Sequence, residues 1–122
     1  MEIVIHQRND TLISQLISDK VEIINVNDSL DLIGDSSYLG ANKVIVKKEN
    51  ICPDFFDLRT GIAGEILQKF SNYRMELAIV GDFSAHKSKS LRDFINESNR
   101  TGRILFVDSV EEAIRMMSIR KS

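Results

Sequence analysis

The run KVIVK at residues 43–47 decides the fold class of this chain. Its three central residues are apolar and β-branched on both alternating faces, which is typical of a strand buried between helices in a sheet. Similar runs recur as ELAIVG at 76–81 and RILFV at 103–107. The sequence therefore predicts three buried strands in one sheet.

Segments with helical spacing separate these strands. Residues 60–72 place their apolar side chains on one stripe, with charged and amide side chains opposite. Helices are also predicted at 88–98 and at 109–117, the last one opened by a capping box of Ser109 and Glu112. Because crossovers between such strands are right-handed, the strands are expected to be parallel, with helices covering the sheet.

The N-terminal part predicts a different kind of pairing. Residues 2–7 and 11–17 are rich in β-forming residues and are separated by Asn9-Asp10, a pair that tolerates turn conformations. They indicate a β-hairpin at one edge of the sheet. The prediction is a single α/β domain over residues 1–122, with one mixed sheet of about five strands.

The segment between the hairpin and residue 43 is less regular. Residues 21–24 are apolar enough to predict a third short strand. Asp28 is the expected cap of a following helix that ends near Gly40. Gly34 lies inside this helix and weakens its intrinsic propensity.

Composition excludes several classes of protein. The chain has 122 residues, 43% of them hydrophobic, and a formal charge of -2 without a long basic run, so neither a nucleic-acid partner nor a membrane span is expected. One cysteine and two histidines do not supply a closed zinc site. We therefore expect no metal. No glycine-rich nucleotide fingerprint is present, so we also expect no cofactor. The start of the chain lacks a basic signal segment, which favours the cytoplasm.

The order of elements resembles that of the STAS domain, the anti-sigma factor antagonist fold. The similarity covers about residues 43 to 117, and residues 56–62 (FDLRTGI) occupy the place of that family's Asp-Ser-Ser-Gly turn. The turn is one residue longer here, and Leu58 and Arg59 replace the first serine. The resemblance implies that Thr60, just before Gly61, corresponds to a phosphoacceptor on a binding surface switched by phosphorylation.

A second resemblance rests on longer strings. Residues 55–73 and 80–84 look like a bacterial family of small uncharacterised proteins, the domain of unknown function numbered 4180. The similarity covers almost the whole chain. It implies membership of a family but supplies no catalytic residue.

The turn around Thr60 is the first candidate site. A hydroxyl at a helix start lies among free amides, which would stabilise an attached phosphate or a bound anion, and Arg59 is placed to assist. The structural alternative is that Thr60 or Asp57 only caps the helix, while Gly61 and Gly64 allow close packing against the sheet.

The loop from Asp82 to Ser90 is the second candidate site. It follows a buried strand, where open α/β sheets bind ligands, and it contains Ser84 and His86. Residues two apart need a specific bend to form a nucleophile and base, and no nucleophile elbow is present. The structural alternative is a polar loop that caps a helix.

These observations favour a small regulatory protein-interaction domain over an enzyme, although catalysis stays open. Its recognition surface is predicted at the following residues: Asp57, Arg59, Thr60, Gly61, Gly64, Asp82, Ser84 and His86. The alternative is a small-molecule-binding protein or a hydrolase that uses the Asp82 to Ser90 loop, and a deep pocket there would favour it. The expected partner is a protein. A homodimer through the N-terminal edge strand is a further alternative, with Glu2, His6 and Arg8 as guards of that edge.

Overall fold

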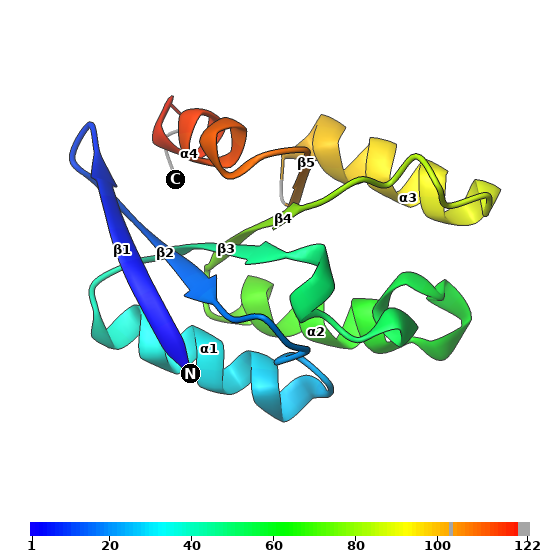
Figure 1. The fold of residues 1–122 in the computed structure, drawn as a ribbon, viewed down its shortest axis with the longest axis horizontal. Helices are drawn as coiled ribbons and strands as arrows, with labels where there is room; N and C mark the ends of the chain where they lie inside the picture. Colours follow the sequence, from blue (N-terminus) through cyan, green and yellow to red (C-terminus); the bar gives the residue numbers. More distant parts are fainter. Residues whose placement is uncertain (103, 120–122) are drawn as a thin grey trace.

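The protein forms one five-stranded sheet with the strand order β1-β2-β3-β4-β5, as seen in a computed structural model that describes residues 1–102 and 104–119 (Figure 1). The strands are β1 (Glu2–Arg8), β2 (Thr11–Ile17), β3 (Lys43–Lys47), β4 (Glu76–Val80) and β5 (Ile104–Val107). β1 is antiparallel to β2, and β2 to β5 are parallel. The predicted α/β class, with a mixed sheet and an N-terminal hairpin, is confirmed.

Strand β3 is buried on both faces, as its sequence predicts. Val44 and Val46 contact one hydrophobic cluster and Ile45 contacts another, and none of the three is more than 2% exposed. Lys43 at the start of the strand is also buried, and its ammonium pairs with Glu76, which is its neighbour in the register of β4.

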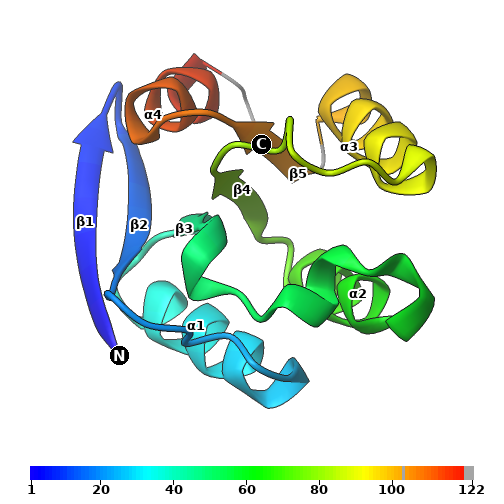
Figure 2. The same cartoon turned by 45° about the vertical axis from the view of Figure 1, so that its right-hand side comes forward.

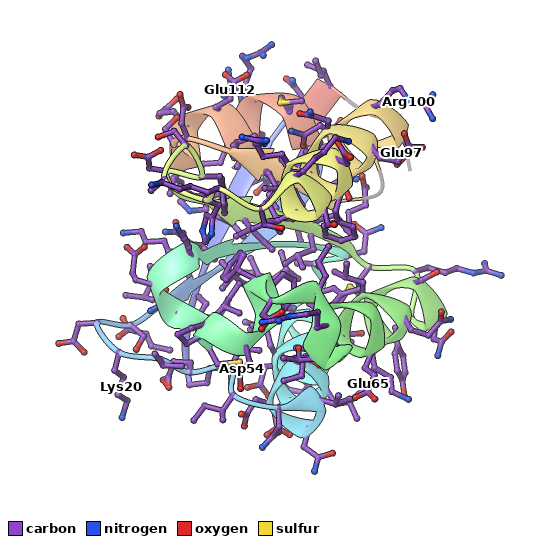
Figure 3. All side chains as sticks on the ribbon, turned by 90° about the vertical axis from the view of Figure 1, so that its right-hand side faces the viewer. Lys20, Asp54, Glu65, Glu97, Arg100 and Glu112 are labelled. Carbon is purple, nitrogen blue, oxygen red and sulfur yellow. The ribbon has the colours of Figure 1, made fainter. Side chains whose placement is uncertain are left out.

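Four helices cover the two faces of the sheet: α1 (Val26–Tyr38), α2 (Ile62–Asn72), α3 (Lys89–Thr101) and α4 (Val110–Ile119). Side chains of α1, α2 and α3 share the larger cluster with Val44 and Val46, whereas α4 packs on the Ile45 face. Figure 2 shows α4 across the sheet from α1 and α2. Charged side chains such as Glu97 and Arg100, which form an ion pair, project from the outer side of α3 (Figure 3).

The N-terminal hairpin has the predicted turn. Asn9 and Asp10 both have positive φ, 52° and 62°, and they join the closing pair Arg8 and Thr11. Two consecutive residues with positive φ are the signature of a type I′ turn, whose twist matches that of the flanking strands. Asparagine and aspartate adopt this region more readily than other residues with side chains.

The predicted strand at 21–24 is wrong. Only Ile23 makes a bridge, to Ile51, because this segment lies against the loop that follows β3 rather than in the sheet. The buried Asn50 holds this segment in place. Its backbone oxygen accepts from the amides of Glu22 and Ile23, and its side-chain amide donates to the backbone oxygens of Ser18 and Lys20.

The expected cap of α1 is also wrong. Asn25 caps the helix, and Asp28 is the third helical residue, whose carboxylate accepts from the Asn25 amide to complete a capping box. At α4, Ser109 accepts from the Glu112 amide as predicted, while the Glu112 carboxylate binds Arg115. The sequence therefore identified the cap of α4 but missed Asn25 as the cap of α1.

The helix predicted at 60–72 begins two residues later. Three short 3-10 helices follow β3: η1 (Lys48–Asn50), η2 (Pro53–Phe56) and η3 (Leu58–Thr60). Gly61, with a φ of 77°, separates η3 from α2.

A side chain of α3 binds the outer edge of β5 at Phe106. The Asn99 amide group of α3 donates to the backbone oxygen of Phe106 at 3.2 Å, and its carbonyl accepts from the Phe106 amide at 2.7 Å. Asn99 therefore bonds this strand in the way that a neighbouring strand would.

We expect Asn99→Ala to lower the free energy of unfolding by about 1 kcal/mol, because two hydrogen bonds to the edge strand are lost. The matched control is Asn72→Ala, which removes a surface contact to Gln68 only. Urea denaturation measures both. Equal, near-zero effects of the two variants would show that the Phe106 contact contributes nothing.

Candidate functional site

The two segments predicted as a recognition surface follow neighbouring strands, and Phe56, which directly precedes the first segment, contacts the second. The turn from Asp57 to Gly64 comes after β3, and the loop from Asp82 to Ser90 comes after β4. The Phe56 ring lies 6.0 Å from the Phe83 ring and 5.7 Å from the His86 ring, measured between centroids. The site therefore lies at the carboxyl ends of parallel strands, where α/β proteins bind ligands.

Gly81 allows a close approach that the sequence did not reveal. A Cβ atom placed there would lie 2.6 Å from the Cβ of Lys48, which is closer than such atoms approach. The lysine side chain can therefore lie across the end of β4. Its ammonium donates to the backbone oxygen of Asp82 at 2.9 Å and lies 5.3 Å from the centre of the Phe83 ring. Cation–π attraction to the Phe83 ring also stabilises this position of the Lys48 ammonium.

The His86 ring stacks against Phe56, and one of its nitrogens has no hydrogen-bond partner among the described residues. This nitrogen, Nε2, is buried. Burial lowers the pKa of His86 below its ordinary value, the nearby Lys48 lowers it further, and Asp82 acts in the opposite direction. The lowered pKa favours the neutral imidazole, in which one nitrogen donates and the other accepts.

A mostly apolar pocket of about 320 Å³ opens beside this imidazole. Its lining consists of Val21, Lys48, Glu49, Ile51, Pro53, Phe56 and His86. Apolar walls with a few polar groups at fixed positions are typical of binding pockets. The pocket has the volume for one large side chain or a small aromatic molecule, and it is open to solvent.

Ser84 and His86 do not form a nucleophile and base. The Ser84 hydroxyl donates to the Asp82 carboxylate at 2.6 Å, and the Ser84 amide donates to the same oxygen at 2.9 Å. These two bonds, more than the Lys48 charge, hold the pKa of Asp82 below its ordinary value. A nucleophilic serine needs a base that accepts its proton. The Asp82 carboxylate forms a local turn with Ser84 and orients the loop.

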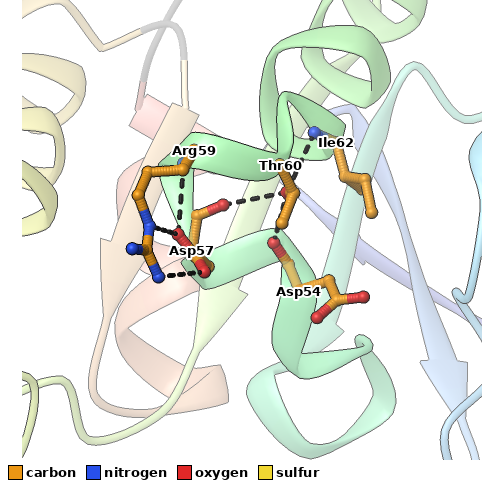
Figure 4. Close-up of polar contacts among 5 residues, drawn as sticks. All are labelled: Asp54, Asp57, Arg59, Thr60 and Ile62. Atoms are coloured by element: carbon orange, nitrogen blue, oxygen red, sulfur yellow. Dashed lines mark hydrogen bonds and ion pairs between the residues drawn. The ribbon is translucent and has the colours of Figure 1, made fainter.

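Thr60 is tied to backbone carbonyl groups more than to free amides (Figure 4). Its hydroxyl lies 2.8 Å from the backbone oxygens of both Asp54 and Asp57, between which it shares one proton, and it accepts from the Ile62 amide at 3.3 Å. Thr60 therefore joins the end of η2 to the start of α2.

Asp57 and Arg59 form a pair within the same turn. The Asp57 carboxylate accepts from the backbone amide of Arg59 and from its guanidinium, with distances of 3.2, 3.0 and 3.0 Å. Arg59 thus lowers the pKa of Asp57, mainly through the side-chain bond. The Arg59 side chain is 90% exposed, so its guanidinium can exchange Asp57 for an incoming anion.

The two glycines of this turn have different roles. Gly61 has a φ of 77°, a conformation that glycine adopts without strain. A Cβ at either Gly61 or Gly64 would meet no atom within 4 Å, so the alternative that these glycines allow close packing against the sheet is wrong at both.

The sequence did not single out Lys48, although it precedes the predicted site in the chain. The signal was Gly81 directly after a buried strand, since glycine there indicates a close neighbour. Within the described residues, no group of three side chains is arranged to hold a metal ion, and no helix has the length and apolarity needed to cross a membrane.

These features define a mixed α/β protein with a pocketed surface at the carboxyl ends of its central strands. Residues 8–117 match the family described as a domain of unknown function, DUF4180, and the chain belongs to that family. Neither the curated proteins nor the solved structures compared with it gave a match. The predicted family is confirmed, and the similarity to STAS domains stays a prediction.

We expect Gly81→Ala to destabilise the protein by about 1–3 kcal/mol, because the new methyl group overlaps the Lys48 stem. Gly34→Ala in α1 is the matched control: its Cβ meets no atom within 4 Å, and alanine stabilises a helix interior by about 1 kcal/mol. Thermal unfolding of both variants tests the close approach. Equal effects of the same sign would contradict it.

Proposed function

We propose that this chain is a regulatory protein-interaction module of the cytoplasm, with its recognition surface at the pocket lined by Phe56 and His86. The observation that carries the proposal is the contact of Phe56 with Phe83 and His86, which holds the Asp82 to Ser90 loop beside an open apolar pocket. A free, buried Cys52 is compatible with a reducing compartment. The arrangement of Ser84 on Asp82 favours binding over hydrolysis.

Lys48 and Glu49 give the pocket lining one charge of each sign, and the basic loop that carries His86 favours an acidic partner segment with an apolar or aromatic anchor. Residues 84–92 carry three basic side chains, Lys87, Lys89 and Arg92, and no acidic one. Lys89 is paired with Asp93, whereas Lys87 and Arg92 are exposed. Anchors of this kind fill pockets at the centre of interfaces, while surrounding charges select and orient the partner.

Phosphorylation of Thr60 is the proposed switch. A kinase would transfer the terminal phosphoryl group of ATP to Oγ1, and the hydroxyl proton would be released. The phosphate cannot donate to the oxygens of Asp54 and Asp57, and its charge repels them. Because these two residues flank the stretch that contains Phe56, release of the turn would alter one wall of the pocket.

We expect the capped peptide acetyl-Glu-Phe-Asp-amide to bind this surface and the lysine analogue acetyl-Lys-Phe-Lys-amide to bind more weakly. Chemical shifts of His86 and of residues 82–90 in NMR titrations measure both. Lys48→Met keeps an apolar stem and removes the charge. It should lower the affinity for the acidic peptide about threefold. Lys69→Met on α2 is the control.

Three outcomes separate the alternatives. Tighter binding of the lysine analogue would contradict an acidic partner. Shift changes confined to other parts of the chain would place any interaction elsewhere. Binding of phenylacetate at this pocket, without binding of either peptide, would favour the small-molecule alternative.

We expect Thr60→Glu to lower the affinity for the acidic peptide more than Thr60→Val does. Both variants remove the hydroxyl bonds, at a cost in stability of about 1 kcal/mol, but only glutamate adds a negative charge beside the carbonyl oxygens. Peptide titrations and the ring resonances of Phe56 report the effect. Unchanged affinity and unchanged Phe56 resonances in Thr60→Glu would contradict the switch.

A further inference from the structure

β1 is the open edge of the sheet. Among the described residues its only strand neighbour is β2, and Figures 1 and 2 show it at the outer margin, whereas Asn99 binds the backbone of Phe106 at the opposite edge. Val4 and Ile5, which lie on opposite faces of β1, are each 37% exposed. Open apolar edges are templates for pairing with another strand.

The turn determines which backbone groups face outward. In a two-residue hairpin the closing pair, Arg8 and Thr11, exchanges both of its hydrogen bonds, and the bonded pairs then alternate along the strands. Glu2, Val4, His6 and Arg8 therefore bond to β2. The amides and carbonyl groups of Ile3, Ile5 and Gln7 point away from the sheet.

We propose that β1 pairs antiparallel with β1 of a second copy, about a two-fold axis at Ile5. Ile5 then lies opposite Ile5 of the second copy, and Ile3 lies opposite Gln7. In this register every outward-facing residue meets another outward-facing residue. The pairing joins the two five-stranded sheets into one continuous sheet.

Charge complementarity specifies this register. Glu2 lies opposite Arg8 of the second copy, and symmetry forms the same pair twice. Neither side chain forms an ion pair with a described residue of its own chain. Moving the axis to Val4 or to His6 leaves the outward groups paired but separates both charge pairs. The residues predicted as guards of the edge are therefore complementary to a second copy of themselves.

Apolar contact supports the same arrangement. Ile5 and its symmetry mate become direct cross-strand neighbours, and Val4 lies beside His6 of the second copy. Cross-strand neighbours have Cβ atoms about 5 Å apart, so the exposed parts of these side chains cover one another. The interface is small, so the dimer should form in a concentration-dependent equilibrium.

Charge-reversal variants of the full chain test the register. Sedimentation equilibrium over a concentration series, at low salt, measures the dimer dissociation constant. Glu2→Arg and Arg8→Glu each place like charges at both ends of the interface and should each raise that constant about tenfold. An equimolar mixture of the two variants pairs opposite charges again and should restore association.

Arg92→Glu on α3 is the matched control, because it makes the same change in net charge as Arg8→Glu and should leave the dissociation constant unchanged. Circular dichroism verifies that each variant is folded. Amide exchange gives a second measurement: Ile3, Ile5 and Gln7 should gain protection as the concentration rises, whereas Val4 and His6 are protected throughout.

Two results would overturn the proposal. One is a wild-type chain that stays monomeric at the highest concentration. The other is a dimer whose dissociation constant is unaffected by Glu2→Arg and Arg8→Glu, since that dimer would use another surface. Both are independent of whether the pocket binds a peptide, so the dimer and the proposed function can fail separately.

Discussion

Burial of β3 on both faces is the constraint on which the rest of the structure depends. Its apolar residues take part in both hydrophobic clusters, so helices must cover the sheet on each side. Even the charged end of the strand is enclosed, and Lys43 is compatible with this burial because Glu76 lies beside it on β4. A buried pair of this kind adds little net stability, but removal of one partner leaves an uncompensated charge. The pair therefore favours the observed register of β3 and β4 over shifted ones.

The candidate site is a consequence of how the chain leaves β3 and β4. Three short 3-10 helices after β3 keep the chain close to the end of the sheet, where the Phe56 side chain turns toward Phe83 and His86. Gly81 lets Lys48 cross the end of β4, and the lysine then holds the start of the next loop through the Asp82 carbonyl group. The pocket walls thus come from segments that are fixed by the backbone of their neighbours, which limits the cost of ordering them when a ligand binds.

Local patterns predicted much of this fold, and contacts between distant residues account for most of what they missed. The three buried strands and the hairpin with its turn at Asn9-Asp10 depend on nearby residues, and their predictions were correct. The strand at 21–24 failed because Asn50, far along the chain, binds that segment. At the candidate site, the sequence identified both segments but not Lys48 or the engagement of the Thr60 hydroxyl. Both features depend on how turns lie in space, which periodicity does not encode.

The two edges of the sheet show how one chain can separate its roles. Asn99 of α3 binds the outward-facing backbone groups of Phe106, so the β5 edge is engaged at this residue. β1 has no such partner among the described residues and carries opposite charges at its two ends. The pocket is lined by residues outside β1, so pairing through β1 leaves the pocket open in both copies. A partner with two acidic anchors would then gain affinity from its second contact without any new interaction at either pocket, provided that its linker spans the two sites.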